Sequence, residues 1–299
     1  MWLRVADLER ALAFYRDLLG LGLVRAEGGT ATLAAGGGGE QPGRELIVLS
    51  ERPGVARRPR RPVSTGLYHV ALLVPSRGDL GRALLGLAAA RYPLRGASDH
   101  AVSESLYLDD PDGNGLEIYA DRPRAAWRWH EGEVYMTVEA MDYEGVIAAA
   151  REGGDPGAWR GLPRATVVGH VHFTVSNLDR SVAFYRDVLG FEETARLPGL
   201  AGVAAGGYHH HVNLNVWAGE DPPRDSERIA GLDAWELVVA GRDARGALAD
   251  RIAAAGALAP ERGGVAAGRE AAAAPRDARE LAPIHAVDPD RIRVDVVEG

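Results

Sequence analysis

Histidine and carboxylate side chains are the main candidates for chemistry in this chain, because it contains no cysteine and no lysine. Their absence excludes thiolate metal sites, cysteine nucleophiles and Schiff-base chemistry. Glu117 stands between Leu116 and Ile118 in an apolar run. A carboxylate buried there without a partner would cost several kcal/mol, so a cation beside Glu117 would account for its position.

Three further candidates, His69, His100 and Tyr107, precede Glu117 within two predicted elements and the segment between them. Residues 66–74 predict a strand that carries His69. Residues 103–121 predict a hairpin around the turn sequence PDGNG, with Tyr107 and Glu117 on its two strands. Taken singly, a histidine in a strand is more often a hydrogen-bonded structural residue. The types and positions of the four residues do not by themselves establish a functional site.

An internal repeat indicates how these elements are organised. Residues 8–21 (LERALAFYRDLLGL) and 178–191 (LDRSVAFYRDVLGF) are identical at nine of fourteen positions, at an offset of 170. Both segments have apolar residues at helical spacing, with an N-cap candidate before them and a C-cap glycine, Gly20 or Gly190, near their end. Two matching openings this far apart predict a duplicated domain.

Each half also repeats internally, in the order strand, helix, hairpin. The elements of this weaker repeat cover residues 66–74, 79–94 and 103–121 in the first half, and 231–239, 243–256 and 288–299 in the second. The chain therefore predicts an α+β fold of four βαβββ modules, with two modules in each half. We expect domains at 1–123 and 168–299, joined by a linker at 124–167 that contains a helix over 138–152. Residues 266–280 predict a low-complexity insert.

The repeated helix and the hairpin resemble the vicinal oxygen chelate superfamily, which includes glyoxalase I, bleomycin-resistance proteins and extradiol dioxygenases. The motifs AFYRDLLGL, LYHVALLVPSR, DPDGNGLEIY and GGYHHHVNLNVW are similar to those of two-domain catechol 2,3-dioxygenase-like enzymes. The resemblance covers nearly the whole chain. It implies that the modules pair into two open, cup-shaped barrels.

The resemblance also implies a metal site. Extradiol enzymes bind Fe(II), sometimes Mn(II), through two histidines and a glutamate that leave coordination positions open. Carried over to this sequence, His69 and Glu117 are metal ligands on the first and last strands of module two. His100 takes the place of the acid–base histidine, and Tyr107 the place of the catechol-binding tyrosine.

The remaining ligand is expected on the first strand of module one. The offset of 170 sets His170 against a position immediately before Met1, where this sequence has no residue. We therefore expect either a natural start further upstream, or a site with two ligands or none that binds little metal and has impaired activity.

The second half departs from the ligand pattern differently. Module four has Ala234 where His69 would be, and Asp295 where Glu117 would be. Residues two apart share a face of a strand, so a second polar pocket is a candidate on the inward face. Its residues would be His170, His172, His209, His211, Asn213, Asn215 and Asp295. A degenerate scaffold remains the favoured interpretation of this half.

The leading functional hypothesis is cleavage of a catechol-type aromatic by O2. The alternatives are a metal-free binding protein similar to the bleomycin-resistance members and, ranked last, a glyoxalase-like isomerase. A formal charge of −8 without a basic tail argues against nucleic acid and anionic membranes as partners. No apolar run reaches the ~18 residues of a membrane helix, so we expect a cytoplasmic protein, and a homodimer stays open.

Overall fold

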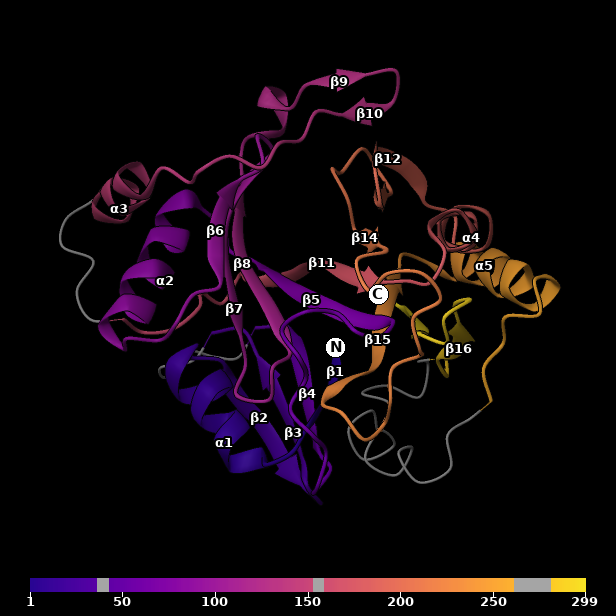
Figure 1. Cartoon of the computed structure of the whole chain (residues 1–299), viewed down its shortest axis with the longest axis horizontal. Helices are drawn as coiled ribbons and strands as arrows, with labels where there is room; N and C mark the ends of the chain where they lie inside the picture. Colours follow the sequence, from indigo (N-terminus) through magenta and orange to yellow (C-terminus); the bar gives the residue numbers. More distant parts are fainter. Residues whose placement is uncertain (37–42, 153–158, 261–280) are drawn as a thin grey trace.

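The computed structural model describes residues 1–36, 43–152, 159–260 and 281–299 and contains four related modules (Figure 1). The first module consists of β1 (Trp2–Val5), α1 (Leu8–Leu12), η1 (Ala13–Leu18), β2 (Gly22–Glu27), β3 (Thr30–Ala34) and β4 (Glu45–Glu51). The second consists of β5 (Gly66–Leu73), α2 (Arg77–Ala89), β6 (Gly96–Asp99), β7 (Ser103–Asp109) and β8 (Gly115–Asp121).

The second half repeats this order. Its first module consists of β11 (Val167–Thr174), α4 (Leu178–Ala183), η3 (Phe184–Val188), β12 (Glu192–Leu197), β13 (Leu200–Ala204) and β14 (Val212–Asn215). The last module shows β15 (Gly231–Val239), α5 (Arg242–Ala254), β16 (Ile284–Val287) and β17 (Arg293–Glu298). The predicted α+β fold of paired βαβββ modules is confirmed. The predicted insert at 266–280 lies outside the described residues.

The two copies of the AFYRD motif fold alike because the same kinds of capping residue stand at the start and the end of their helices. Asp7 and Asn177 cap the two helices by accepting hydrogen bonds from the backbone N–H groups of Arg10 at 2.8 Å and Arg180 at 2.9 Å. Both helices then widen into a π-helical turn, η1 or η3. Gly20 follows the first of them with a φ of +71°, a left-handed conformation that favours glycine.

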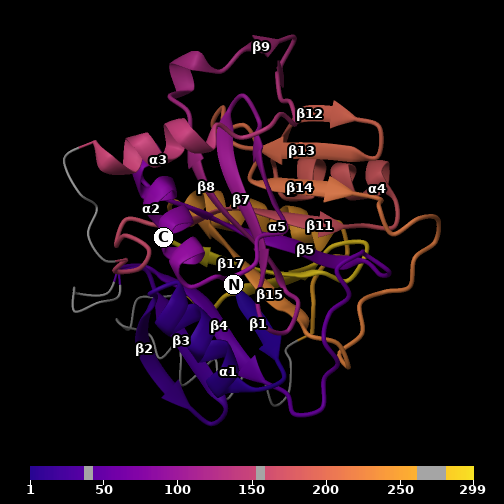
Figure 2. The same ribbon diagram turned by 60° about the vertical axis from the view of Figure 1, so that its left-hand side comes forward.

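Hydrogen bonding joins the modules across the halves of the sequence. The eight-stranded sheet has the order β12-β13-β14-β11-β5-β8-β7-β6 and combines module two with module three. The seven-stranded sheet has the order β16-β17-β15-β1-β4-β3-β2 and combines module one with module four. Figure 2 shows β12, β13, β14, β11 and β5 side by side. The expected strand pairing of modules within each half is therefore not found: module two pairs with module three, and module one with module four.

Modules of the same half contact each other in another way. Tyr15 on η1 is fully buried and donates a hydrogen bond to Asp110, in the turn between β7 and β8, at 3.0 Å. Tyr185 on η3 donates to Asp288 at 3.2 Å in the same manner. The motif tyrosine thus joins a helix to a hairpin turn within each half, and strand pairing joins the halves.

The linker packs on this framework. It contains η2 (Arg124–Ala126), the hairpin of β9 (Trp129–His130) and β10 (Glu133–Val134), and α3 (Tyr143–Arg151). The helix starts five residues later than predicted because the Asp142 side chain caps it, accepting from the Gly145 N–H at 2.9 Å. It lies against α2 at Gly81, where an added Cβ would approach the Val146 carbonyl to 2.2 Å.

Among the helices in the described ranges, none combines the length and apolarity needed to cross a bilayer.

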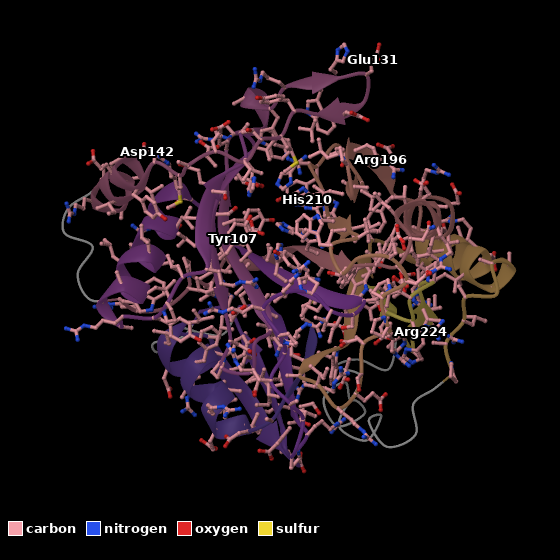
Figure 3. All side chains as sticks on the ribbon, in the orientation of Figure 1. Tyr107, Glu131, Asp142, Arg196, His210 and Arg224 are labelled. Atoms are coloured by element: carbon pink, nitrogen blue, oxygen red, sulfur yellow. The ribbon has the colours of Figure 1, made fainter. Side chains whose placement is uncertain are left out.

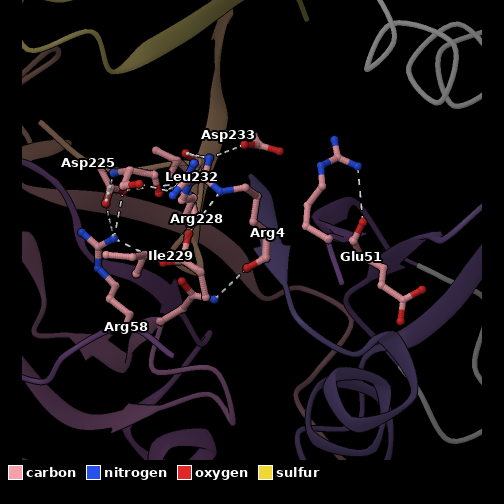
Figure 4. Close-up of polar contacts among 12 residues, drawn as sticks. Arg4, Glu51, Arg58, Asp225, Arg228, Ile229, Leu232 and Asp233 are labelled. Atoms are coloured by element: carbon pink, nitrogen blue, oxygen red, sulfur yellow. Dashed lines mark hydrogen bonds and ion pairs between the residues drawn. The ribbon is translucent and has the colours of Figure 1, made fainter. Parts of the chain in front are cut away.

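Buried ion pairs join module one to module four and to the segment just before it (Figure 4). Arg4 on β1 donates to the Asp233 carboxylate on β15 and lies 3.7 Å from the carboxylate of Asp225. Arg58, in the loop before β5, approaches Asp225 to 2.9 Å. All four side chains are at most 16% exposed, so each charge depends on its partners.

Replacing Arg4 with Met should therefore destabilise the protein by about 3–5 kcal/mol, because it removes a buried cation that donates to Asp233 and lies close to Asp225. Urea unfolding measures this loss. Arg16→Met is the matched control, since it removes an ion pair with Asp17 at the surface and should change stability little. Equal stabilities of the two variants would contradict a structural role for the Arg4 pairs.

Candidate metal centre

Three side chains with metal-binding atoms converge on the inner face of the eight-stranded sheet. His69 Nε2 lies 2.9 Å from Glu117 Oε2, and His170 Nε2 lies 3.1 Å from the same oxygen. One donor atom from each residue lies within 4.8 Å of the other two. All three residues are buried, at 5%, 2% and 4% relative exposure.

The register of three central strands produces this convergence. Ala71 on β5 is paired with Glu117 on the parallel strand β8 and with His170 on the antiparallel strand β11. Residues opposite each other in a sheet share a face, and so do residues two apart on a strand. Glu117 and His170 therefore flank Ala71, and His69 lies two residues along β5 on the same face. The small side chain of Ala71 leaves space between the three.

The site's electrostatics favour metal donors in their binding forms. Burial alone would raise the pKa of Glu117, but His170 and His69 outweigh it and hold that pKa well below its usual range. Burial lowers the pKa of His69 despite the nearby Glu117 carboxylate. An ionised carboxylate and a neutral imidazole, the forms that bind metal, are thus present together at neutral pH.

One ring nitrogen of each histidine has no hydrogen-bond partner, while His170 Nε2 shares a hydrogen bond with Glu117. His69 Nε2 is close to Glu117 but makes no hydrogen bond of acceptable geometry, and His170 Nδ1 has no hydrogen-bond partner. Buried polar atoms are normally satisfied. Two imidazoles and one carboxylate on one face fit the facial triad of a divalent transition metal.

The expected loss of a third ligand is not what the structure shows. His170 from module three occupies the place that was assigned to the first strand of module one. Pairing of module one with module two would require the imidazole on β1, whereas the strands pair module two with module three, whose first strand β11 carries His170. Because β11 is the partner of β5, no residue before Met1 is needed for three donors.

The residues proposed for a second pocket are divided between the two sheets. His170 joins Glu117, and His172 accepts a hydrogen bond from Asn215 Nδ2 at 2.9 Å. His209 and His211 lie in the turn before β14, so strand alternation does not apply to them. Asn213, on β14, pairs with His172 on β11 and Gly202 on β13. Asp295 is in the other sheet, where it contacts His285 at 2.6 Å and Arg293 at 3.0 Å.

The corresponding position of the seven-stranded sheet is filled by an apolar contact. Trp2 on β1 pairs with Ala234 on β15, in the way that His172 pairs with His69. Trp2, Val48 and Ala234 form a small buried cluster. The degenerate half of the duplication is therefore the sheet shared by modules one and four, rather than the C-terminal half of the sequence.

His100 and Tyr107 form a hydrogen-bonded pair beside the three donors. His100 Nε2 and the Tyr107 hydroxyl are 2.7 Å apart, and His100 Nδ1 is 2.7 Å from the Thr137 carbonyl of the linker. The Tyr107 ring centroid is 5.6 Å from that of His69. Burial, followed by the charge of Glu117, raises the pKa of Tyr107 well above its usual value, so its hydroxyl keeps its proton.

His210 is a further candidate that the sequence reasoning missed. It is 4% exposed, and its ring lies edge to face with His170 at a centroid distance of 4.4 Å. Figure 3 shows Tyr107 on the side of the sheet formed by β7 and β8, and His210 toward the side formed by β14. Strand alternation selected His209 and His211 from the run of three histidines. That run was the only signal in the sequence that could have indicated His210.

Fold and site together define the class of protein. Residues 1–118 and 167–296 match the Glyoxalase/Bleomycin resistance protein/Dioxygenase superfamily, and the chain belongs to this family. It is 43% identical over 257 residues to the catechol-2,3-dioxygenase of Bacillus subtilis (strain 168), covering 85% of this chain and 86% of that protein. The resemblance inferred from the motifs is confirmed.

Solved structures share the fold. A putative dioxygenase from Bacillus subtilis superposes with a TM-score of 0.64 at 15% identity, covering 100% of this chain and 83% of that chain. The E144Q mutant of glyoxalase I from Zea mays superposes with a TM-score of 0.53 at 15% identity, covering 99% and 91%. At these identities the likeness concerns the fold alone.

His170→Ala should lower the affinity for Mn(II) by more than about 100-fold, beyond the loss typical of residues that only support a ligand. Isothermal titration of the anaerobic, chelator-treated protein measures this affinity. His172→Ala is the matched control, because it removes another buried histidine from the same strand and should lower affinity far less. Undiminished binding by His170→Ala would exclude His170 as a ligand.

His211 should make stability depend on pH. Burial, followed by the charges of His209 and His170, lowers its pKa from 6.5 to about 4. Between these values the unfolded chain takes up a proton that the folded protein does not. Stability should therefore fall as the pH is lowered, by up to about 1.4 kcal/mol per pH unit from this residue. Urea unfolding at several pH values should show a shallower slope for His211→Gln than for the wild type. Identical slopes would contradict the shifted pKa.

Proposed function

We propose that this protein is an extradiol dioxygenase that cleaves a catechol-type aromatic with O2. The observation that carries the proposal is the His69–His170–Glu117 donor set, with the hydrogen-bonded pair of His100 and Tyr107 beside it. In this reaction a ring carbon–carbon bond next to the two hydroxyl-bearing carbons breaks. Both atoms of O2 enter the product, so no further reductant is required.

The donor set suits Fe(II), with Mn(II) as the alternative. His69, His170 and Glu117 would hold the ion, and bound there it would supply open coordination positions for the two catechol oxygens and O2. The parallel and antiparallel neighbours of β5 fix the three donors, so they are positioned before any substrate arrives.

The chain's own residues would orient the catechol and move its protons. The Thr137 carbonyl accepts from His100 Nδ1, so the Nε2 of a neutral His100 accepts the Tyr107 proton. The Tyr107 oxygen held in this way can accept a hydrogen bond from a substrate hydroxyl. Burial lowers the pKa of His210 well below 6.5, so this imidazole is neutral and able to accept a proton. His100 and His210 approach the donor set from different sides and are the two candidates for general acid–base catalysis.

The similarity to the Bacillus subtilis catechol-2,3-dioxygenase supports this proposal over the alternatives, since it spans most of both chains. A metal-free binding protein would have no use for a buried carboxylate oxygen between two imidazoles. The glyoxalase-like alternative has the shared fold of the Zea mays structure and a 32% identity to the probable lactoylglutathione lyase of Synechocystis, which covers 39% of this chain against 85% for the catechol-2,3-dioxygenase.

The test is anaerobic loading with Fe(II), followed by addition of catechol and oxygen. Ring cleavage should give a yellow ring-opened product, and Glu117→Gln should abolish both metal binding and product formation. Tight catechol binding without product, in protein that holds stoichiometric Fe(II), would contradict the proposed reaction and favour a binding protein.

Two substitutions separate the proton-transfer candidates. The residue that acts as general acid–base catalyst should lose roughly 10²–10⁴-fold in kcat on replacement by Phe, with metal content intact. We expect this loss in His210→Phe, because His210 is neutral and packs against a metal-donor imidazole. His100→Phe should mainly raise KM through Tyr107, whose orientation it supports. The reverse pattern would assign the proton transfer to His100.

A further inference from the structure

A chain of hydrogen bonds runs from His210 to a half-buried carboxylate. His210 Nδ1 and His209 Nδ1 are 2.9 Å apart, and His209 Nε2 is 2.9 Å from Asp121 Oδ1. His209 is fully buried, whereas the Asp121 side chain is 23% exposed. The neighbouring rings of Tyr208, Trp127 and His210 pack around His209 at centroid distances of 4.1–5.0 Å.

The chemistry of each group sets the direction of these bonds. An ionised carboxylate such as Asp121 can only accept, so His209 must donate from Nε2. A neutral imidazole carries one proton, which leaves His209 Nδ1 as an acceptor. His210 must then donate from its Nδ1, and its Nε2 keeps the lone pair.

A second branch supports the same direction. The Tyr208 hydroxyl donates to Asp121 Oδ2 at 2.9 Å, and the Tyr119 and Tyr208 hydroxyls are 2.8 Å apart. Every donor in both branches points toward Asp121, which has no proton to give. The far ends of the branches, His210 and Tyr119, both pack on the His170 ring, at 4.4 and 4.8 Å.

We propose that Asp121 and His209 are positioning residues that hold His210 in its Nδ1–H tautomer. The ring nitrogens lie on different sides of an imidazole, so a bond from Nδ1 to His209 turns the Nε2 lone pair away from His209. A fixed tautomer saves the cost of selecting one at each turnover, as an oriented carboxylate does for a catalytic histidine. The catalytic meaning of this lone pair rests on the proposed function, and the tautomer itself does not.

Nitrogen NMR measures the tautomer without turnover. In the full-length protein labelled with 15N-histidine, treated with chelator and then loaded with diamagnetic Zn(II), long-range proton–nitrogen correlations show which ring nitrogen bears hydrogen. His210 should be protonated on Nδ1 in both states. A proton on its Nε2, or an imidazolium at His209, would overturn the proposal, and neither observation needs a variant.

Variants test whether His209 sets the tautomer. His209→Leu should shift His210 toward Nε2–H and lower kcat with catechol by roughly 10–100-fold at little change in KM. His209→Asn should restore the Nδ1–H form, because an asparagine oxygen can accept the same bond. Tyr208→Phe is the matched control: it removes the other donor to Asp121 and should leave the His210 tautomer unchanged.

An unchanged tautomer in His209→Leu would also overturn the proposal. If the tautomers follow expectation and catechol is not cleaved by the iron-loaded wild type, the proposed function fails and the positioning role stands. If catechol is cleaved and His210 carries its proton on Nε2, the positioning role fails and the proposed function stands.

Discussion

The antiparallel pairing of β5 with β11 is the contact on which the candidate site depends. It sets His170 opposite Ala71, while the parallel pairing with β8 sets Glu117 on the other side of the same residue. A shift of one position would turn His170 to the opposite face of the sheet. The backbone hydrogen bonds of three strands thus bring together two imidazoles and a carboxylate from sequence positions 69, 117 and 170.

Burial gives this arrangement its chemical character. It disfavours every charge on the inner face, so His69 and His210 are neutral, and Glu117 stays ionised only because two imidazoles approach it. The same constraint orders the surrounding hydrogen bonds. Asp121, at the edge of the buried region, is the one acceptor toward which the His209 and Tyr208 donors converge.

The internal repeat produces two similar sheets, and within the described residues only the eight-stranded sheet carries the set of three donors. Trp2 and Ala234 fill the position that His172 and His69 occupy in the other sheet, and Asp295 forms ion pairs with neighbouring side chains. Tyr15 and Tyr185 keep the modules of each half in contact through buried hydrogen bonds. The modules of each half are therefore in contact in the same way, although the donor set lies in one sheet.

The sequence by itself determined what depends on local spacing. Capped helices at the AFYRD motifs, the PDGNG hairpin, and the strand positions of His69 and Glu117 all follow from periodicity within a few residues. Partner choice among four similar first strands does not, because any of them can present the same backbone hydrogen bonds. Only the tertiary structure decided that β11 lies beside β5, which made His170 the third donor and placed His210 against it. Contacts between residues 69 and 170 are set by long-range packing, on which local sequence carries no information.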